Sequence, residues 1–247
     1  MTYWLSVYTL WNRELVRFYR QPSRVVGALG TAVLFWGVLG TGIGGSATRV
    51  YFFPGTLVMS MLFTCIFSNA SVIEDRQAGF LQSVLVAPVS RGALVMGKIL
   101  GGATLAFCQG AVLLALGFTV GASFTPGGLL GLLVSLFLTA FVLTGMGFWL
   151  AWTVESSPGF HTLMNLILLP LWMASGAVFS APPSSWLGLL MKVNPLTYGV
   201  AAIRRGLFPG MDAASLPSLG LCWAVLLALG LGLYAFSAFA VEKSKIK

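Results

Sequence analysis

Long apolar runs separated by short polar or charged breaks make up most of this chain. A helix needs about 20 apolar residues to cross a bilayer, and six runs reach that length. The pattern predicts membrane-spanning helices at residues 25–47, 52–73, 90–120, 126–154, 158–179 and 216–241. The stretch from Ile99 to Val154 holds 56 residues without a charge and is divided at Thr125 and Pro126, a cap residue followed by a proline suited to the first helical turn.

Cap residues and prolines indicate where other spans begin or bend. Ser90 is a suitable N-cap for the third span. Ser157 followed by Pro158 repeats the cap-proline pattern and opens the fifth. Pro170 lies inside that span, where we expect it to kink the helix.

Residues 1–22 have the spacing of an amphipathic helix. Apolar positions recur every three or four residues while polar side chains and arginines occupy the other face. The apolar positions are Trp4, Tyr8, Trp11, Leu15 and Phe18. We expect this helix to lie in the membrane interface; packing against a partner is the alternative.

Two further regions are too short to cross. Residues 74–88 begin with the charged triplet Glu74, Asp75 and Arg76, and the side chains that repeat at helical spacing before Pro88 are Gln77, Phe80, Leu81, Val84 and Leu85. This pattern predicts a short amphipathic helix at the surface. In residues 182–210, prolines bound the segments SSWLGLLMK and LTYGVAAIRRGLF, which we expect to be re-entrant or outer helices.

Composition agrees with an all-α membrane protein. Of the 247 residues, 57% are hydrophobic and 8% are charged, too few to cover a soluble surface. We therefore expect residues 1–247 to form a single transmembrane domain, with any large catalytic unit on another chain. Three cysteines, Cys65, Cys108 and Cys222, lie inside apolar runs and predict buried thiols.

The net charge of +8 reflects topology better than nucleic-acid binding, because the basic residues lie at the ends of apolar runs. Six spans place both termini on one side, and a cytoplasmic assignment puts ten of the 14 Lys and Arg residues inside. The four outside are Arg49, Lys192, Arg204 and Arg205. The group from Lys192 to Arg205 needs a local reason beyond topology.

Motifs for catalysis, nucleotides and metals are poor matches. GTGIGG follows no strand, and GALVMGKI has Ile99 where a nucleotide-binding loop needs Ser or Thr. His161 precedes Ser175 by 14 residues in an order unlike that of intramembrane hydrolases. We therefore expect no catalytic residue, no metal and no cofactor in this chain. Glycine pairs at small-xxx-small spacing predict close helix packing: Gly97/Gly101, Gly117/Gly121 and Gly127/Gly131.

Ionisable residues are essentially absent from the interior of the spans, which disfavours a proton- or ion-driven carrier. Three regions then resemble, in order, the permease subunits of ABC-2 type ABC exporters. They are PGTLVMSMLF with IEDRQAGFLQSVLVAPVSRGALVMGKIL, LLPLWMASGAVFS, and NPLTYGVAAIRRGLF. The resemblance covers essentially the whole chain.

The resemblance implies that residues 74–88 form a cytoplasmic coupling helix seated on a separate nucleotide-binding ATPase, which would hold ATP and Mg²⁺. The coupling residues would be Glu74, Asp75, Arg76, Gln77, Gly79, Phe80, Leu81, Val84, Leu85 and Pro88. A second permease would pair with this one, and the pathway or dimer candidates are Trp36, Phe63, Phe67, Pro170, Ser175 and Gly176. An outer gate would contain Asn194, Pro195, Tyr198, Arg204 and Arg205.

Arg204 and Arg205 are expected either to anchor at outer headgroups or to contact lipid phosphates or an anionic substrate. The resemblance is closest to the drug and antibiotic branch, so we expect export of a lipophilic drug, antibiotic or lipid-like substrate across a bacterial-type inner membrane. Polysaccharide or glycolipid export is the alternative within the family. An ATP-independent carrier or channel, and a membrane enzyme, are alternatives from other classes.

Overall fold

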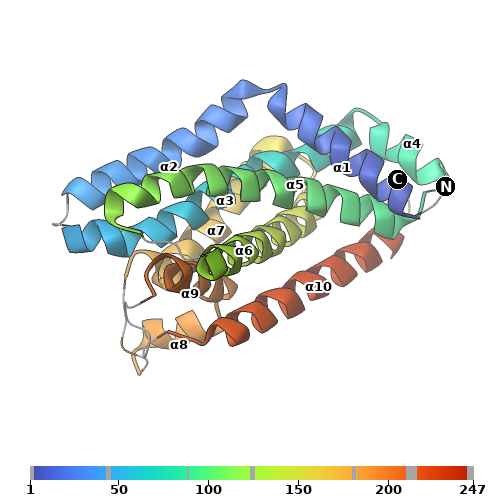
Figure 1. Cartoon of the computed structure of the whole chain (residues 1–247). Helices are drawn as coiled ribbons and strands as arrows, with labels where there is room; N and C mark the ends of the chain where they lie inside the picture. The colour runs from blue at the N-terminus through green and yellow to red at the C-terminus, as the bar shows by residue number, and fades with distance from the viewer. Residues whose placement is uncertain are drawn as a thin grey trace.

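The computed structural model describes residues 3–42, 46–87, 89–122, 126–179, 182, 184–209 and 216–243. Every regular element within these ranges is helical. In chain order they are α1 (Tyr3–Tyr19), α2 (Pro22–Gly42), α3 (Ser46–Gln77), α4 (Phe80–Val86), α5 (Arg91–Leu113) with a 3₁₀ extension η1 (Leu114–Val120), α6 (Pro126–Thr153), α7 (Ser157–Trp172) with a π-helical turn η2 (Met173–Ala177), α8 (Trp186–Val193), α9 (Pro195–Leu207) and α10 (Leu219–Lys243). Figure 1 shows α4 and the start of α1 at one end of the bundle, with α8 and α9 toward the other.

Five helical segments are long and apolar enough to cross a membrane. They are Ala47–Gln77, Arg91–Val120, Gly127–Thr153, Ser157–Ala177 and Leu219–Lys243, and they overlap the predicted second to sixth spans. The predicted first span overlaps a shorter apolar helix, Pro22–Val38. The protein is therefore a multi-pass, all-helical membrane protein, while the count of six spans stays a prediction.

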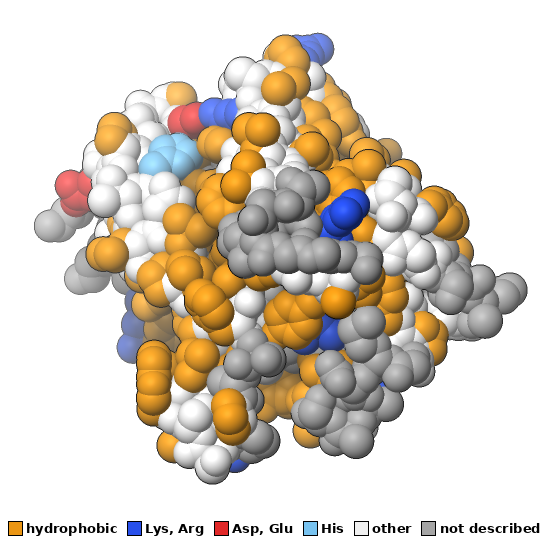
Figure 2. Space-filling view, turned by 90° about the vertical axis from the view of Figure 1, so that its left-hand side faces the viewer, with side chains coloured by type: hydrophobic (Ala, Val, Ile, Leu, Met, Phe, Trp, Pro, Cys, Tyr) orange, Lys and Arg blue, Asp and Glu red, His pale blue; other side chains and the backbone are white. Residues whose placement is uncertain are grey.

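α3 lies at the centre of the bundle. It contacts α2, α5, α6 and α7, and 72% of its most apolar window is buried, against 22% for α10. Leu57 and Met61 of α3 are completely enclosed, whereas Leu221 and Phe236 of α10 are about half exposed. Apolar side chains on the outside of such a bundle suit contact with lipid. Hydrophobic groups also cover much of the end seen in Figure 2.

The end of the second span differs from the prediction. α3 continues through Glu74, Asp75 and Arg76 to Gln77, and Gly79, with φ +72°, separates it from α4. The left-handed conformation at Gly79 breaks the helix at little cost because glycine has no Cβ. The single surface helix predicted over residues 74–88 is therefore wrong: its first four residues belong to α3. Pro88 lies outside the described residues.

α1 packs along α5 at a pair of glycines. A Cβ added to Gly97 would lie 2.8 Å from the Leu10 Cβ, and one added to Gly101 would lie 2.7 Å from the Glu14 Cβ. The close approach predicted for this pair is thus confirmed, with α1 as the neighbour. The same is not true of Gly127, which has open space around it.

Only part of the apolar stripe predicted for α1 packs against the rest of the protein. Val7, Leu10 and Phe18 are buried, whereas Trp4 and Tyr8 are more than half exposed. α1 therefore has two apolar strips, one on α5 and one outside. The structure favours packing for the first strip; the interfacial position of the helix stays a prediction.

Helix caps and breaks follow the sequence signals with small shifts. The Ser90 hydroxyl accepts from the Ala93 N–H at 3.2 Å, which confirms the predicted cap. Ser156, not Ser157, caps α7, accepting from the Gly159 N–H at 3.3 Å. α7 continues through Pro170, and the backbone departs from helical geometry at Gly176, with φ +81°.

Candidate functional site

Five charged side chains of α1, α3 and α5 form a largely buried group, called here the charge cluster: Arg13, Glu14, Arg17, Asp75 and Lys98. Asp75 is 2% exposed, and Glu14 and Lys98 are each 3% exposed. The Lys98 ammonium lies 2.7 Å from a Glu14 carboxylate oxygen and also contacts Asp75. Buried charges need such partners, because an unpaired one keeps its desolvation penalty.

The arginines of α1 hold the acidic end of α3. Arg13 donates to both carboxylate oxygens of Asp75, at 2.8 and 2.7 Å. Arg17 donates to Asp75 at 2.6 Å and to Glu74 at 2.5 Å. Arg24 of α2 donates to the Phe67 carbonyl at 3.0 Å and pairs with Glu74. The hydrogen bonds to Asp75 raise the pKa of Arg13 above its ordinary value.

Glu74 and Asp75 therefore join α3 to α1 and α2. They lie inside α3 and not at the start of a separate surface helix, and arginines of the same chain pair with their carboxylates. Their part in coupling to an ATPase stays a prediction. Ser71, one turn earlier, adds a hydrogen bond to Glu14 at 2.7 Å.

Arg76 points to a different neighbour, the carboxyl end of α6. Its guanidinium donates to the Val154 carbonyl at 3.0 Å and the Trp152 carbonyl at 2.8 Å, and it lies over the Trp152 ring at 5.1 Å. These carbonyls have no partner further along their own helix, and a cation suits the negative end of the helix dipole. Gln77 donates to the Glu155 carbonyl at 3.2 Å. The last turn of α3 is thus hydrogen-bonded to the end of α6 as well as to α1.

α4 rests against this assembly on one side. The Arg13 guanidinium carbon lies 3.7 Å from the centre of the Phe80 ring, Leu81 is buried, and Val84 packs against the core. Gln82, Ser83 and Val86 lie on the exposed side, with Val86 81% exposed. These three residues were not among the sequence-predicted coupling residues. The side chain of Leu85 lies outside those that the structure describes.

A second polar group joins α9 to the first turns of α3, at the opposite end of that helix from the charge cluster. Arg204 is 5% exposed, donates to the Gly176 carbonyl at 2.9 Å and the Tyr51 carbonyl at 3.2 Å, and lies 4.2 Å from the centre of the Tyr51 ring. Tyr51 donates its hydroxyl to the same Gly176 carbonyl at 3.1 Å. In this conformation the Arg204 guanidinium is buried against backbone carbonyls of its own chain. Its contact with a lipid headgroup or an anionic substrate stays a prediction.

The other predicted gate residues shape the same region. Asn194 caps α9, accepting from the Leu196 N–H at 3.0 Å, and its amide donates to the Leu171 carbonyl at 2.6 Å. Pro195 is the first residue of α9. Tyr198 donates to the Lys192 carbonyl at 2.8 Å, and Arg205 donates to the Pro217 carbonyl at 2.8 Å. Arg204 and Arg205 of α9 thus both bind backbone carbonyls of their own chain.

The pathway candidates are spread over three helices. The ring centre of Trp36 lies 6.0 Å from that of Phe53, and the ring centre of Phe67 lies 6.0 Å from that of His161. Phe63 is partly buried and Pro170 exposed. Ser175 and Gly176 are buried, and the Ser175 hydroxyl donates to the Trp172 carbonyl at 2.6 Å. At 1.5 Å per residue, Ser175 and His161 are about 20 Å apart along one helix, too far for a catalytic dyad.

Sequence reasoning missed two of the three most buried members of the charge cluster, Glu14 and Lys98. A signal was present: Glu14 is the sole acidic residue before Glu74, and Lys98 is the last charge before 56 uncharged residues. Among the described residues, no three metal-ligating side chains come together.

The chain is similar to known membrane proteins. Residues 6–208 match the family model described as ABC-2 type transporter. A relative named transport permease ycf38, from Cyanophora paradoxa, is 27% identical over 215 residues, covering 81% of this chain and 73% of the relative. The inner membrane transport permease YadH of Escherichia coli strain K12 is 23% identical over 247 residues, covering 91% of this chain and 95% of the relative.

Proposed function

The chain belongs to the ABC-2 type transporter family, and on that premise we propose that it is the membrane-spanning permease subunit of an ATP-driven exporter. It is a transport subunit, and a separate nucleotide-binding subunit holds ATP and Mg²⁺ and hydrolyses the nucleotide. A second permease, identical or related, completes the transmembrane unit. Because a relative is named an inner membrane permease, we place this chain in an inner membrane, with both termini cytoplasmic.

One observation carries the proposal: α4 is linked to three other helices through side-chain contacts. Phe80 lies under Arg13, Arg13 binds Asp75, and the neighbouring Arg76 binds the end of α6. A force applied to α4 therefore reaches α1, α3 and α6 without passing through a loop. The exposed side of α4 is the surface that we assign to the ATPase subunit.

In this account ATP binding closes the two ATPase subunits and moves α4. The helices attached to it shift the permease pair from inward to outward access, and hydrolysis resets the cycle. At the other end, Arg204 and Tyr51 hold Gly176, where α7 loses its regular geometry. We assign this junction to the outer gate, which must open during export.

The substrate that fits best is a lipophilic drug, antibiotic or lipid-like molecule. The pathway candidates on α2 and α3, Trp36, Phe63 and Phe67, are aromatic and uncharged, and the charged residues of α3 lie at its ends. A pathway so poor in charge favours an apolar substrate. Polysaccharide or glycolipid export is the second candidate, because the relatives' names do not separate the two.

Purification from the native host tests the proposal. The tagged chain is extracted in a mild detergent, its partners are identified by mass spectrometry, and ATP hydrolysis by the complex is measured. Recovery of an ATPase subunit at equal stoichiometry supports the exporter. A lone chain without ATP hydrolysis in several detergents contradicts it and favours an ATP-independent carrier or channel.

A further inference from the structure

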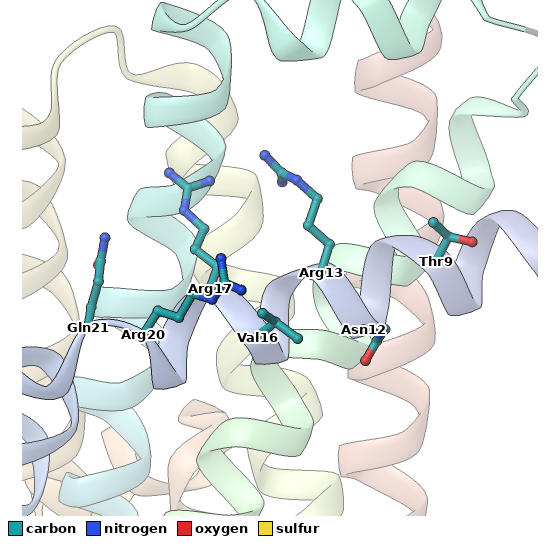
Figure 3. Close-up of a pocket in the computed structure, with 7 residues that line it drawn as sticks. All are labelled: Thr9, Asn12, Arg13, Val16, Arg17, Arg20 and Gln21. Carbon is teal, nitrogen blue, oxygen red and sulfur yellow. The ribbon is translucent and has the colours of Figure 1, made fainter.

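A groove of about 620 Å³ runs along the side of α1 that faces away from α5. Its lining residues are Thr9, Asn12, Arg13, Val16, Arg17, Arg20 and Gln21. Figure 3 shows Arg13, Arg17 and Gln21 extending from one side of α1, with the Arg20 side chain running back toward Arg17. The groove is therefore bordered by three guanidinium groups, by the side-chain amides of Asn12 and Gln21 and by the Thr9 hydroxyl.

The groove carries excess positive charge. In and beside it, four cations pair with the three carboxylates of Glu14, Glu74 and Asp75: Arg13, Arg17, Arg24 and Lys98. Arg20 adds a fifth cation. Five cations against three anions leave two positive charges. Arg20 is exposed, and among the described residues it forms no ion pair, whereas Arg13 and Arg17 hold carboxylates on their inner side.

Apolar and aromatic side chains lie next to the groove on the outer surface of α1. Trp4, Tyr8 and Tyr19 are 69%, 59% and 61% exposed, and Val16 lies in the groove itself. Tyrosine and tryptophan favour the headgroup level of a bilayer, where one end of the side chain is apolar and the other is hydrated. A free anion would leave this apolar strip exposed to water, whereas the acyl chains of a lipid would cover it.

We propose that the groove on α1 binds the phosphate of an anionic phospholipid, with Arg20 as the principal donor. A guanidinium presents paired N–H groups that match phosphate oxygens. Gln21 adds an amide donor next to Arg20, Asn12 adds one further along the groove, and the neighbouring aromatic strip lies along the lipid. The site is separate from the proposed ATPase surface on α4 and does not depend on the transported substrate.

Lipid binding to the purified full chain tests this site. Native mass spectrometry measures the dissociation constant of the first phosphatidylglycerol bound, then that of phosphatidylcholine with the same acyl chains. One basic residue near an anionic lipid contributes about 1 kcal/mol, so Arg20→Gln is expected to weaken phosphatidylglycerol binding about fivefold. Arg20→Lys should restore part of the loss, because the charge returns without the paired donors.

Arg49→Gln is the matched control, since Arg49 is exposed on α3 at the far end of the bundle and forms no ion pair among the described residues. It should leave phosphatidylglycerol binding unchanged. Equal affinity for the two lipids, or equal losses in Arg20→Gln and Arg49→Gln, would overturn the proposal. Displacement of phosphatidylglycerol by millimolar inorganic phosphate would assign the groove to a free anion instead, and unchanged lipid binding with loss of a protein partner in Arg20→Gln would assign it to that partner.

Discussion

Arg13 donates through both terminal nitrogens to the two carboxylate oxygens of Asp75, at 2.8 and 2.7 Å, which joins α1 to the last turn of α3. The pair is 62 residues apart in sequence. Since the same guanidinium lies over Phe80, this contact also fixes the position of α4. The charge cluster is therefore the structural base of the surface that we assign to the ATPase subunit.

Asp75→Asn should destabilise the protein strongly. The substitution keeps the shape of the side chain but leaves Lys98 and the facing arginines without their shared anion, and breaking a buried ion pair costs about 3 kcal/mol or more. For a chain of this size, that lowers the midpoint of thermal unfolding by about 6–12 °C. Glu242→Gln, at an exposed acid on α10, should have almost no effect. Equal midpoints for the two variants would show that the cluster contributes little.

Glu14 and Lys98 should be energetically coupled. Each single substitution, Glu14→Gln or Lys98→Met, leaves the other charge buried, whereas the double variant removes both. The double variant should therefore be more stable than the sum of the single effects predicts, by about 1–3 kcal/mol. A double-mutant cycle from denaturant unfolding in detergent measures this difference. Strict additivity would contradict a direct interaction at 2.7 Å.

Arg204→Gln should loosen the outer junction. The loss of charged hydrogen bonds to Gly176 and Tyr51 costs about 2 kcal/mol, so hydrogen exchange in α9 should quicken by roughly thirtyfold. Arg204→Lys should restore protection only in part, because an ammonium can also donate to both carbonyls but lacks the guanidinium plane that lies over the Tyr51 ring. Arg49→Gln, at the same end of α3, is the control. Unchanged exchange in α9 would remove Arg204 from the gate.

Gly79→Ala should cost about 1 kcal/mol of unfolding free energy. There is open space around Gly79, so the cost comes from its φ of +72° and not from a clash. Gly30→Ala is the matched control: Gly30 also has open space and lies inside α2, where alanine is the better helix former. Gly30→Ala should be neutral or slightly stabilising. The same loss in both variants would mean that the turn before α4 is not under this constraint.

The sequence predicts three of the spans well and the end of α3 poorly. The spans overlapping α5, α6 and α10 follow from uncharged runs and from caps such as Ser90. The charges of Glu74 and Asp75 looked like the end of a span, but α1 and α2 supply arginines that let α3 continue. The sequence around Glu74 and Asp75 does not reveal this neutralisation, because the arginines that pair with them are 50 to 62 residues away.

Amphipathic spacing likewise does not show which face of a helix packs against the rest of the protein. Two pairs of residues in α1 have helical spacing: Trp4 with Tyr8, and Val7 with Leu10. The second pair is buried because this face of α1 packs on Gly97 and Gly101 of α5. Arg204 illustrates the same limit. Its position near an outer loop suggested lipid contact, whereas the unusual geometry at Gly176 offers it a free carbonyl inside the protein.

The central claim is that the exposed side of α4 binds an ATPase subunit, and one matched pair of variants tests it directly. Val86 on α4 is 81% exposed and Val193 on α8 is 83% exposed, at opposite ends of the bundle. The measurement is the ratio of ATPase to permease after purification from the native host. The account predicts that Val86→Arg lowers this ratio at least about tenfold, the effect of roughly 1.4 kcal/mol at a buried interface, and that Val193→Arg leaves it unchanged. Equal ratios in both variants and the unaltered chain would contradict it.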